Sequence, residues 1–385
     1  MLISQRPKAV LLLQDGTRFE GRAIGARGTC VGEICFNTGM IGYQEIITDP
    51  SYTGQIMVMA SPHIGNYGVK EGAGDQLEGE HEGPRISIAG LVVKKFSEVW
   101  SRPGSTGSLE ELLQQAGIAG ISDIDTRKLV RHIRDHGAQN AVIDSSGLPD
   151  QDLRAQLDRA PVMAGLELAS RVSAKQAYDE GPANGAWRVA LVDFGTKLNT
   201  VRCLVERNCT VRIFPMGTAV KEIMAWNPDG ILLSNGPGDP AAMADAISKV
   251  REVLETGLPV FGICLGHQLL ALSQGVRTLK MHHGHRGINH PVRNLVSGRD
   301  EVTSQNHGFV VDPDQAAQHP ALLVTHRHLN DGSIAGIQLK GRPVFSVQHH
   351  PEAGPGPFDS RYLFDRFVEE MKAHKPLRKS RLEHA

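Results

Sequence analysis

A cysteine lies between two glycines where an apolar stretch meets a helical one. Residues 259–268 read PVFGICLGHQ, so Cys264 has one glycine two positions before it and another two positions after it. This spacing is typical of a nucleophile elbow, a sharp strand-to-helix turn that presents one side chain to a cleft. The N-terminus of a helix also favours the thiolate. We therefore predict that Cys264 is a nucleophile; a small buried cysteine in an ordinary turn is the alternative.

Two neighbours of Cys264 carry groups that suit the same chemistry. The backbone N–H of Leu265 follows the nucleophile directly, where it can stabilise an oxyanion. Gln268 lies four residues beyond Cys264, about one helical turn, and so projects near the same helix face. We expect both groups to lie at the reacting centre.

A histidine and a glutamate follow a second apolar stretch. Residues 343–347 predict a strand, and the sequence continues as QHHPE over 348–352. In an extended chain residues i and i+2 point the same way, so His350 and Glu352 share a side while His349 points away. A base and the carboxylate that orients it complete a Cys/His/Glu triad. His349 is the competing base, and a surface histidine beside a turn is the alternative without chemistry.

Two further loops have the character of ligand sites. The sequence SNGPGDP at 234–240 comes directly after an apolar run, at the carboxyl end of a predicted parallel strand, where α/β proteins bind ligands. Its glycines let backbone N–H groups approach a substrate carbonyl. The sequence QNHGF at 305–309 combines polar, glycine and aromatic residues, a weaker signal. The loop at 234–240 taken alone is also compatible with an ordinary turn.

The elements that must position these residues alternate along the C-terminal half of the chain. Short apolar runs at 189–192, 211–214, 231–233 and 260–263 are separated by stretches of helical length. This alternation predicts an α/β fold with a mostly parallel, doubly wound sheet.

The N-terminal part has short apolar runs and frequent glycines, which predict a mixed, β-rich domain. One helix in it is clear, because Leu129 and Ile133 have helical spacing, Gly137 can end it, and Ser122 or Asp123 can cap it. We predict an N-terminal domain over 1–145, a linker over 146–186 with at most one short helix, and a C-terminal domain over 187–378.

The composition of the 385 residues excludes several classes of protein. Lys+Arg is 41 and Asp+Glu is 42, a net charge of −1, so no overall positive field attracts nucleic acid or an anionic membrane. No apolar run approaches the ~18 residues of a membrane span. The five cysteines include no CxxC. We expect a reduced, cytoplasmic protein. Without acidic or cysteine neighbours at ligand spacing, we expect no metal site at the four clustered histidines, His282, His283, His285 and His290.

The segments around Cys264, 234–240, 305–309 and 348–352 together resemble the triad-type (class I) glutamine amidotransferases, over about residues 187–375. The N-terminal part is similar to the small, glutaminase subunits of carbamoyl-phosphate synthases, so the resemblance extends over essentially the full length. The motifs that carry this narrower resemblance are NTGMIGYQE at 37–45, TDPSY at 48–52, PHIGN at 62–66, DIDTRKL at 123–129, HPV at 290–292 and PEAGPGP at 351–357.

The resemblance implies that the chain hydrolyses L-glutamine, with Cys264 as the nucleophile, His350 as the acid/base and Glu352 as its partner. Two positions depart from the family pattern: His349 stands where glycine is frequent, and Arg286 where histidine is frequent. The positions that the resemblance assigns to glutamine binding are Ser51, Gly236, Gly238, Leu265, Gln268, Asn306, Gly308 and Phe309.

The resemblance also implies a partner, the large synthetase subunit, in a heterodimer or a higher oligomer. This partner would receive ammonia through an internal passage and would hold ATP and Mg²⁺, and this chain would need no cofactor of its own. In agreement, the sequence lacks the phosphate-binding pattern G-x-x-x-x-G-K-[ST]. The carbamoyl phosphate would serve arginine or pyrimidine synthesis, and the sequence does not distinguish the two.

Two other classes of protein fit part of the pattern. One is a stand-alone cysteine hydrolase of γ-glutamyl compounds, or an amidotransferase that feeds another synthetase; neither explains the N-terminal domain over 1–145. The other is a regulatory subunit that binds glutamine without turnover, which would not need an intact Cys/His/Glu set.

Overall fold

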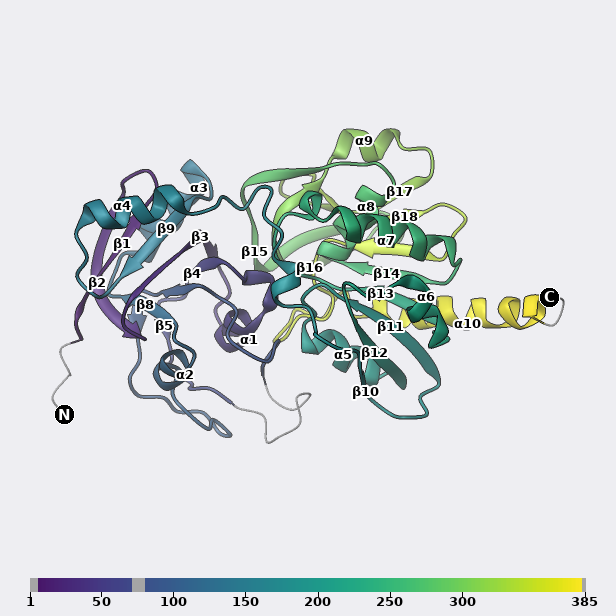
Figure 1. Cartoon of the computed structure of the whole chain (residues 1–385), viewed down its shortest axis with the longest axis horizontal. Coiled ribbons are helices and arrows are strands. Elements are labelled where there is room, and N and C mark those ends of the chain that lie inside the picture. The colour runs from purple at the N-terminus through teal and green to yellow at the C-terminus, as the bar shows by residue number, and fades with distance from the viewer. Residues whose placement is uncertain (1–5, 71–79, 383–385) are drawn as a thin grey trace. The chain divides into compact units, whose positions relative to one another are not determined.

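The computed structural model describes residues 6–70 and 80–382, with side chains up to residue 374. It is a mixed α/β protein, as the sequence predicts. The chain forms two compact units (Figure 1). The first comprises Met1–Leu166 together with His282–Gly287, and the second comprises Glu167–Met281 and Ile288–Ala385.

The first unit contains the N-terminal strands, four α-helices and one 3₁₀ turn among its described residues. Its strands are β1 (Lys8–Leu13), β2 (Arg18–Gly25), β3 (Thr29–Asn37), β4 (Gln55–Met59), β5 (His63–Ile64), β6 (Gly90–Val92), β7 (Lys95–Phe96), β8 (Ala119–Ser122) and β9 (Asn140–Asp144). Its helices are α1 (Tyr43–Thr48), the 3₁₀ turn η1 (Pro50–Tyr52), α2 (Leu109–Gln115), α3 (Thr126–His136) and α4 (Asp150–Arg159).

Seven of these strands close into a barrel, in the order β1-β2-β8-β6-β4-β3-β9. Its β1/β2 hairpin turns at Gly16, whose φ of 88° favours glycine. Alternate residues of β4 pack into different apolar clusters, Ile56 and Val58 in one and Met57 and Met59 in the other, as the period of a strand requires. Both faces of this strand are therefore buried.

Helix α3 confirms one sequence prediction and corrects another. The helix ends at Gly137 as expected, with φ of 90°. Its N-cap is Asp125, whose side chain accepts a hydrogen bond from the N–H of Lys128, and neither Ser122 nor Asp123 caps it. Ser122 is instead the last residue of β8. Asp125 directly precedes the helix, so its carboxylate reaches the N–H of Lys128, which has no acceptor within the helix.

The second unit contains the remaining elements. Its strands are β10 (Tyr178–Glu180), β11 (Trp187–Asp193), β12 (Cys209–Pro215), β13 (Gly230–Leu233), β14 (Val260–Ile263), β15 (Thr278–Asn294), β16 (Asp300–Val311), β17 (Leu322–His328), β18 (Ile334–Leu339) and β19 (Val344–Val347). Its helices are η2 (Ala169–Arg171), α5 (Leu198–Val205), α6 (Val220–Ala225), η3 (Pro240–Ala242), α7 (Ala244–Glu255), α8 (Leu265–Ser273), α9 (Pro313–Gln318) and α10 (Tyr362–Leu382).

These ten strands form one sheet, in the order β10-β12-β11-β13-β14-β19-β18-β17-β15-β16. The run β12-β11-β13-β14-β19 is parallel, and β10 and β18 join it antiparallel at its two sides. The carboxyl ends of β11, β13, β14 and β19 therefore meet at one edge of the sheet. The segments that the sequence places after a strand, at 234–240, at Cys264 and at 348–352, begin at this edge. The segment 305–309, predicted as a loop, lies instead within β16.

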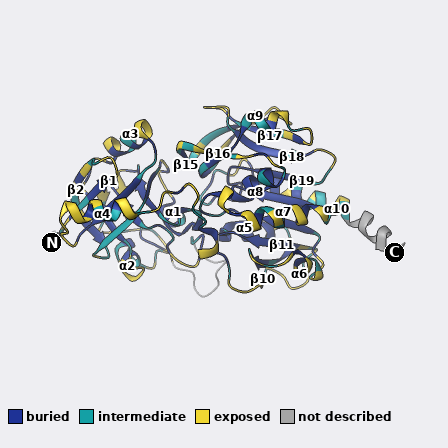
Figure 2. Cartoon of the chain, turned by 45° about the horizontal axis from the view of Figure 1, so that its top comes forward, coloured by how far each residue is buried: buried dark blue, intermediate teal, exposed yellow. Residues whose placement is uncertain are grey.

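Strand β14 is covered on both sides. Val260 belongs to the apolar cluster that also contains Val250 of α7 and Leu269 of α8. Phe261, its neighbour, meets the ring of Phe364 of α10 edge-on at 5.6 Å between centroids. Figure 2 shows the strands of the large sheet as mostly buried.

Among the described residues, no helix is both long and apolar enough to cross a membrane.

The segment 146–186, predicted as a linker with at most one short helix, contains that helix and further regular structure. It contains α4, η2 and β10, and β10 pairs with β12 at the edge of the large sheet. The division between the units falls inside it, after Leu166. The polar composition that suggested a linker reflects a short helix and an edge strand that are largely exposed.

Candidate active site

Cys264 is the single residue between β14 and α8. Its backbone has φ of 51° and ψ of −99°, a conformation that side-chain-bearing residues rarely adopt and that costs on the order of 1–3 kcal/mol. The N–H of Cys264 donates to the carbonyl of Val347 at 2.9 Å, which ties the turn to β19. The strand, turn and helix predicted from the sequence are all present.

The two glycines of the elbow are required by close packing. A Cβ atom added at Gly266 would lie 2.2 Å from the carbonyl oxygen of Leu233, and one at Gly262 would lie 2.9 Å from the carbonyl oxygen of Gly266. Neither contact is possible for a real Cβ atom without movement of the backbone. The close approach of α8 to β13 therefore depends on glycine at position 266.

His350 and Glu352 are hydrogen-bonded to each other. Nδ1 of His350 lies 2.7 Å from Oε1 of Glu352, and both side chains are buried. The contact arises differently from the prediction: β19 ends at Val347, the backbone bends, and the N–H of His350 then donates to the carbonyl of Ser304. The pair is as predicted, but a turn and not an extended strand brings it together.

A buried lysine completes this group. Nζ of Lys197 lies 3.2 Å from Oε1 of Glu352. Burial alone would raise the pKa of Glu352, but the charges of Lys197 and His350 outweigh it and hold this pKa below its usual range. Burial alone would lower the pKa of His350, but Glu352 outweighs it, with a further contribution from Cys264, and raises this pKa. The carboxylate and the imidazolium are thus the stable forms at neutral pH.

The other ring nitrogen of His350 is available for proton transfer. Nε2 of His350 is buried, and Cys264 is the group that it can exchange a proton with. The thiol of Cys264 is one of the groups that raise the pKa of this ring, so the two side chains are neighbours. A base next to the sulfur, oriented by a carboxylate, is the arrangement that activates a nucleophile.

His349 faces a different environment. It is fully buried, both of its ring nitrogens lack a hydrogen-bond partner among the described residues, and its ring meets that of His326 at 5.6 Å between centroids. Burial is the main cause that lowers the pKa of His349 well below its ordinary value. Burial also lowers the pKa of His326 to about 4 and that of His267 to about 3. The imidazoles of His349, His326 and His267 are therefore buried in their neutral form.

Backbone and amide groups surround the sulfur of Cys264. The thiol donates to the carbonyl of Asn306 at 3.6 Å, and Nε2 of Gln348 donates to the sulfur at 3.6 Å. Nε2 of Gln268 donates to the carbonyl of Phe309 at 2.8 Å. The structure thus brings four predicted residues, Cys264, Gln268, Asn306 and Phe309, into one group.

The glycine-rich loop lies against the elbow. A Cβ atom added at Gly236 would lie 2.8 Å from Cδ2 of Leu265, and Gly238 has φ of 95°. As the first residue of α8, Leu265 has an N–H without an intrahelical acceptor. Gly308 belongs to β16, between Asn306 and Phe309. The roles of these residues in glutamine binding stay predictions.

Ser51 belongs to the first unit. It lies in η1, and its N–H donates to Oδ1 of Asp49 at 2.8 Å. Its assignment to the glutamine site came from the resemblance alone and stays a prediction.

Sequence reasoning missed three residues of the site. Lys197 lies beyond the carboxyl end of β11, Asn199 donates through Nδ2 to the carbonyl of Glu352, and Gln348 contacts the sulfur. A basic residue just past a parallel strand was a usable signal for Lys197, because ligand sites gather at that edge. The sequence around Asn199 and Gln348 carries no comparable signal.

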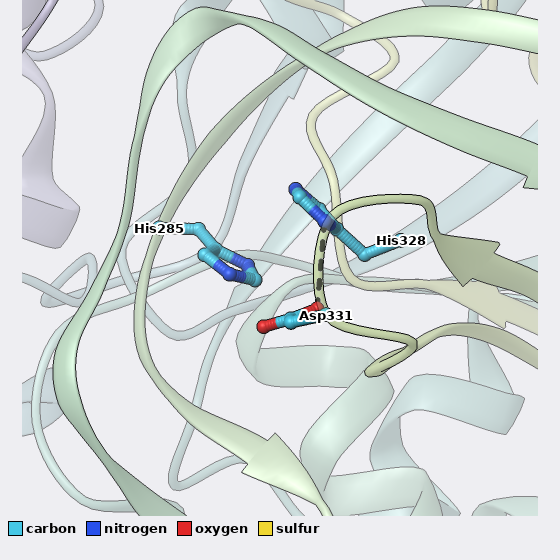
Figure 3. A group of neighbouring side chains, drawn as sticks. All are labelled: His285, His328 and Asp331. Atoms are coloured by element: carbon cyan, nitrogen blue, oxygen red, sulfur yellow. Dashed lines mark ion pairs between the residues drawn. The ribbon is translucent and has the colours of Figure 1, made fainter.

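The histidine-rich segment divides between the two units. His282 accepts a backbone hydrogen bond from Ala138, and His283 stacks on Phe36 at 6.0 Å between centroids, all within the first unit. In the second unit Nδ1 of His290 lies 3.0 Å from Nε2 of His328, whose Nδ1 forms an ion pair with Asp331 (Figure 3). His285, also drawn in Figure 3, belongs to the first unit. The absence of a metal site stays a prediction.

Comparisons with known proteins agree with this geometry. Residues 190–370 match the family Glutamine amidotransferase class-I, and residues 11–143 match the family Carbamoyl-phosphate synthase small chain, CPSase domain. The α/β fold, the cysteine elbow and this match together make the second unit a class-I glutamine amidotransferase domain.

Relatives extend the match to nearly the full length. A carbamoyl phosphate synthase small chain of Synechococcus sp. is 43% identical, covering 98% of this chain and 96% of that protein. The proteins of the same name from Chlorobaculum tepidum and Escherichia coli K12 are 45% and 44% identical, covering 96% and 95% of this chain and 100% and 98% of theirs. The chain belongs to the family of carbamoyl phosphate synthase small chains.

A first prediction concerns the elbow. Replacing Gly266 with Ala forces a Cβ atom against the carbonyl of Leu233, so we expect the free energy of unfolding in urea to fall by about 1–3 kcal/mol, as for other overpacked cores. The alkylation rate of Cys264 should change as well. The matched control is Gly217→Ala, whose added Cβ would meet no atom within 4 Å. Equal stability of the two variants would contradict the packing argument.

A second prediction concerns acid stability. Because the pKa of His349 is lowered in the folded protein, the unfolded chain takes up its proton first as the pH falls below about 6.5, and stability is lost. The raised pKa of His350 acts in the opposite direction, so the comparison must be between variants. Between pH 7.5 and 5.5 the wild type should lose about 1.4 kcal/mol more than His349→Gln in urea unfolding. Parallel pH profiles would show that His349 does not titrate in this way.

Proposed function

We propose that this chain is the glutaminase subunit of a carbamoyl phosphate synthase, which hydrolyses L-glutamine and delivers the ammonia to a large synthetase subunit. One observation carries the proposal: the buried His350–Glu352 pair stands beside Cys264 at the elbow. The same chain is related over nearly its whole length to carbamoyl phosphate synthase small chains. A cysteine next to an imidazole that is oriented by a carboxylate can hydrolyse an amide through a thioester.

In the first half-reaction the thiolate of Cys264 attacks the side-chain amide carbon of glutamine. The oxyanion that forms is held by the N–H of Leu265 and by the glycine loop at Gly236 and Gly238, which packs against Leu265. The imidazolium of His350 gives its proton to the amide nitrogen, the C–N bond breaks, and ammonia leaves. A γ-glutamyl thioester remains on Cys264.

In the second half-reaction the now neutral His350 takes a proton from water. The hydroxide attacks the thioester carbon, the C–S bond breaks, and glutamate leaves. The thiolate and the imidazolium are thereby restored. Glu352, held between His350 and Lys197, keeps Nδ1 of His350 in contact with a carboxylate and leaves Nε2 to carry the proton.

Glutamine is held, in this proposal, by the residues that surround the sulfur. Gln268, Asn306 and Phe309 lie there through the contacts described above. Gly308 and Ser51 complete the set that the family pattern implies.

The large subunit carries the remaining chemistry in this proposal. It holds ATP and Mg²⁺, while this chain uses no cofactor, and the two form a heterodimer or a higher oligomer in the cytoplasm. The N-terminal unit docks to the large subunit, and its polar motifs at 42–45 and 123–128 contain no nucleophile–base pair. We further infer a doubly wound arrangement of the parallel strands, supported by the packing of α8 and α10 against neighbouring residues of β14.

The nucleophile is tested by Cys264→Ser in the complex with the large subunit. We expect glutamine-dependent synthesis of carbamoyl phosphate to be abolished, because no thioester forms at a useful rate. Synthesis from added ammonia should persist, because ammonia enters after the step that needs Cys264. Loss of both activities in an assembled complex would refute this division of labour.

The base is tested by comparing His350→Asn with His349→Asn. The first should lower glutaminase turnover by at least about 10²-fold, in the range that general acid–base catalysis supplies. The second should cost far less, because His350 and not His349 is hydrogen-bonded to Glu352. Steady-state kinetics with glutamine measures both, and a reversed order would assign the proton transfer to His349.

A further inference from the structure

Gln348 is a buried residue that connects the sulfur to a residue proposed to bind glutamine. The residue is 1% exposed and lies just beyond the end of β19. Nε2 of Gln348 donates to Sγ of Cys264 at 3.6 Å, and its Oε1 accepts from Nε2 of Gln268 at 3.0 Å. Neither end of this amide is therefore free to turn without loss of a buried contact.

The orientation of the Gln348 amide follows from a backbone carbonyl. The carbonyl of Phe309 can only accept a hydrogen bond, so the group of Gln268 that faces it must be the NH₂ group. The second N–H of the same NH₂ group points to Gln348, so the group of Gln348 that faces it must be the oxygen. The NH₂ group of Gln348 is then left facing the sulfur.

We propose that Gln348 is a positioning residue that donates a hydrogen bond to the Cys264 sulfur and stabilises its thiolate, with its amide held in this orientation by Gln268 and the Phe309 carbonyl. This inference rests on the proposed glutaminase function and assigns a role within the same site.

The N–H of Gln348 matters because another group next to the sulfur disfavours the thiolate. The carbonyl of Asn306 accepts from the protonated thiol, and a carbonyl oxygen next to a thiolate is unfavourable. The imidazolium of His350, paired with Glu352, which also contacts Lys197, is the positive group next to the sulfur. An N–H from Gln348 offsets the Asn306 carbonyl when the proton leaves, because hydrogen bonds to charged groups are stronger than those to neutral ones.

The hydrogen bonds from Gln268 to Phe309 and Gln348 also fix which atom of Gln268 is left for a substrate. Both N–H groups of its amide are used, one by Phe309 and one by Gln348. Its Oε1 is then the atom that can accept a hydrogen bond from an ammonium or amide group of glutamine. Substrate recognition and thiolate stabilisation share one hydrogen-bonded chain.

The experiment measures the pH dependence of Cys264 alkylation by iodoacetamide in the full-length chain, with the modified peptide identified by mass spectrometry. We expect Gln348→Met, which keeps the length and removes the donor, to move the midpoint upward by about one pH unit. Gln348→Glu, which keeps the shape and replaces the donor with an acceptor, should move it further. Gln268→Met should give a smaller shift in the same direction, because the Gln348 amide is then free to turn.

The control is Gln338→Met, on the adjacent strand β18, where the glutamine oxygen accepts from Arg366 away from the sulfur. It should leave the alkylation profile unchanged. In glutaminase kinetics we expect Gln348→Met to lower kcat by about tenfold or more, with a smaller effect on KM. Normal folding of the variants is checked by circular dichroism, and Gln348→Glu serves if Gln348→Met does not fold.

An unchanged alkylation midpoint in a folded Gln348 variant would overturn the proposal, even if turnover fell. Alkylation does not require catalysis, so a wild-type chain without glutaminase activity would count against the proposed function alone. The two failures are therefore distinguishable.

Discussion

The position of the sulfur depends on a contact between two backbones. Helix α8 approaches β13 so closely that only a residue without Cβ fits at Gly266, and this approach leaves Cys264 in a strained conformation at the helix start. The strain is offset by the sheet, through the hydrogen bond from Cys264 to Val347. Strands β14 and β19 are neighbours in the sheet, and they carry the nucleophile Cys264 and the base His350 just beyond their ends.

The features predicted correctly from the sequence are those that local patterns encode. Continuous apolar runs separated by helical stretches indicate parallel strands, and four such strands are adjacent in the sheet. The glycines around Cys264 indicate a sharp turn, which requires no knowledge of distant residues. The spacing of His350 and Glu352 is short enough that either an extended chain or a turn can bring them together.

The features that sequence reasoning missed depend on contacts between distant segments. Lys197 reaches Glu352 because β11 and β19 end at the same edge of one sheet, and Gln348 reaches Cys264 for the same reason. Sequence alone does not reveal how completely a side chain is buried, so it predicts only that His349 points away from Glu352 and not that this residue is fully buried. The cap of α3 at Asp125 shows that even a clear helix can begin at a nearby alternative carboxylate.

The path of the chain has a consequence for how such a protein can be rearranged by gene fusion. The chain passes from one unit to the other after Leu166, returns at His282 and leaves again after Gly287. The returning segment is fastened within the first unit, where the N–H of Ala138 donates to the carbonyl of His282. A single recombination breakpoint would therefore separate this segment from its own unit. Exchange of the second unit alone requires three junctions, after Leu166, before His282 and after Gly287.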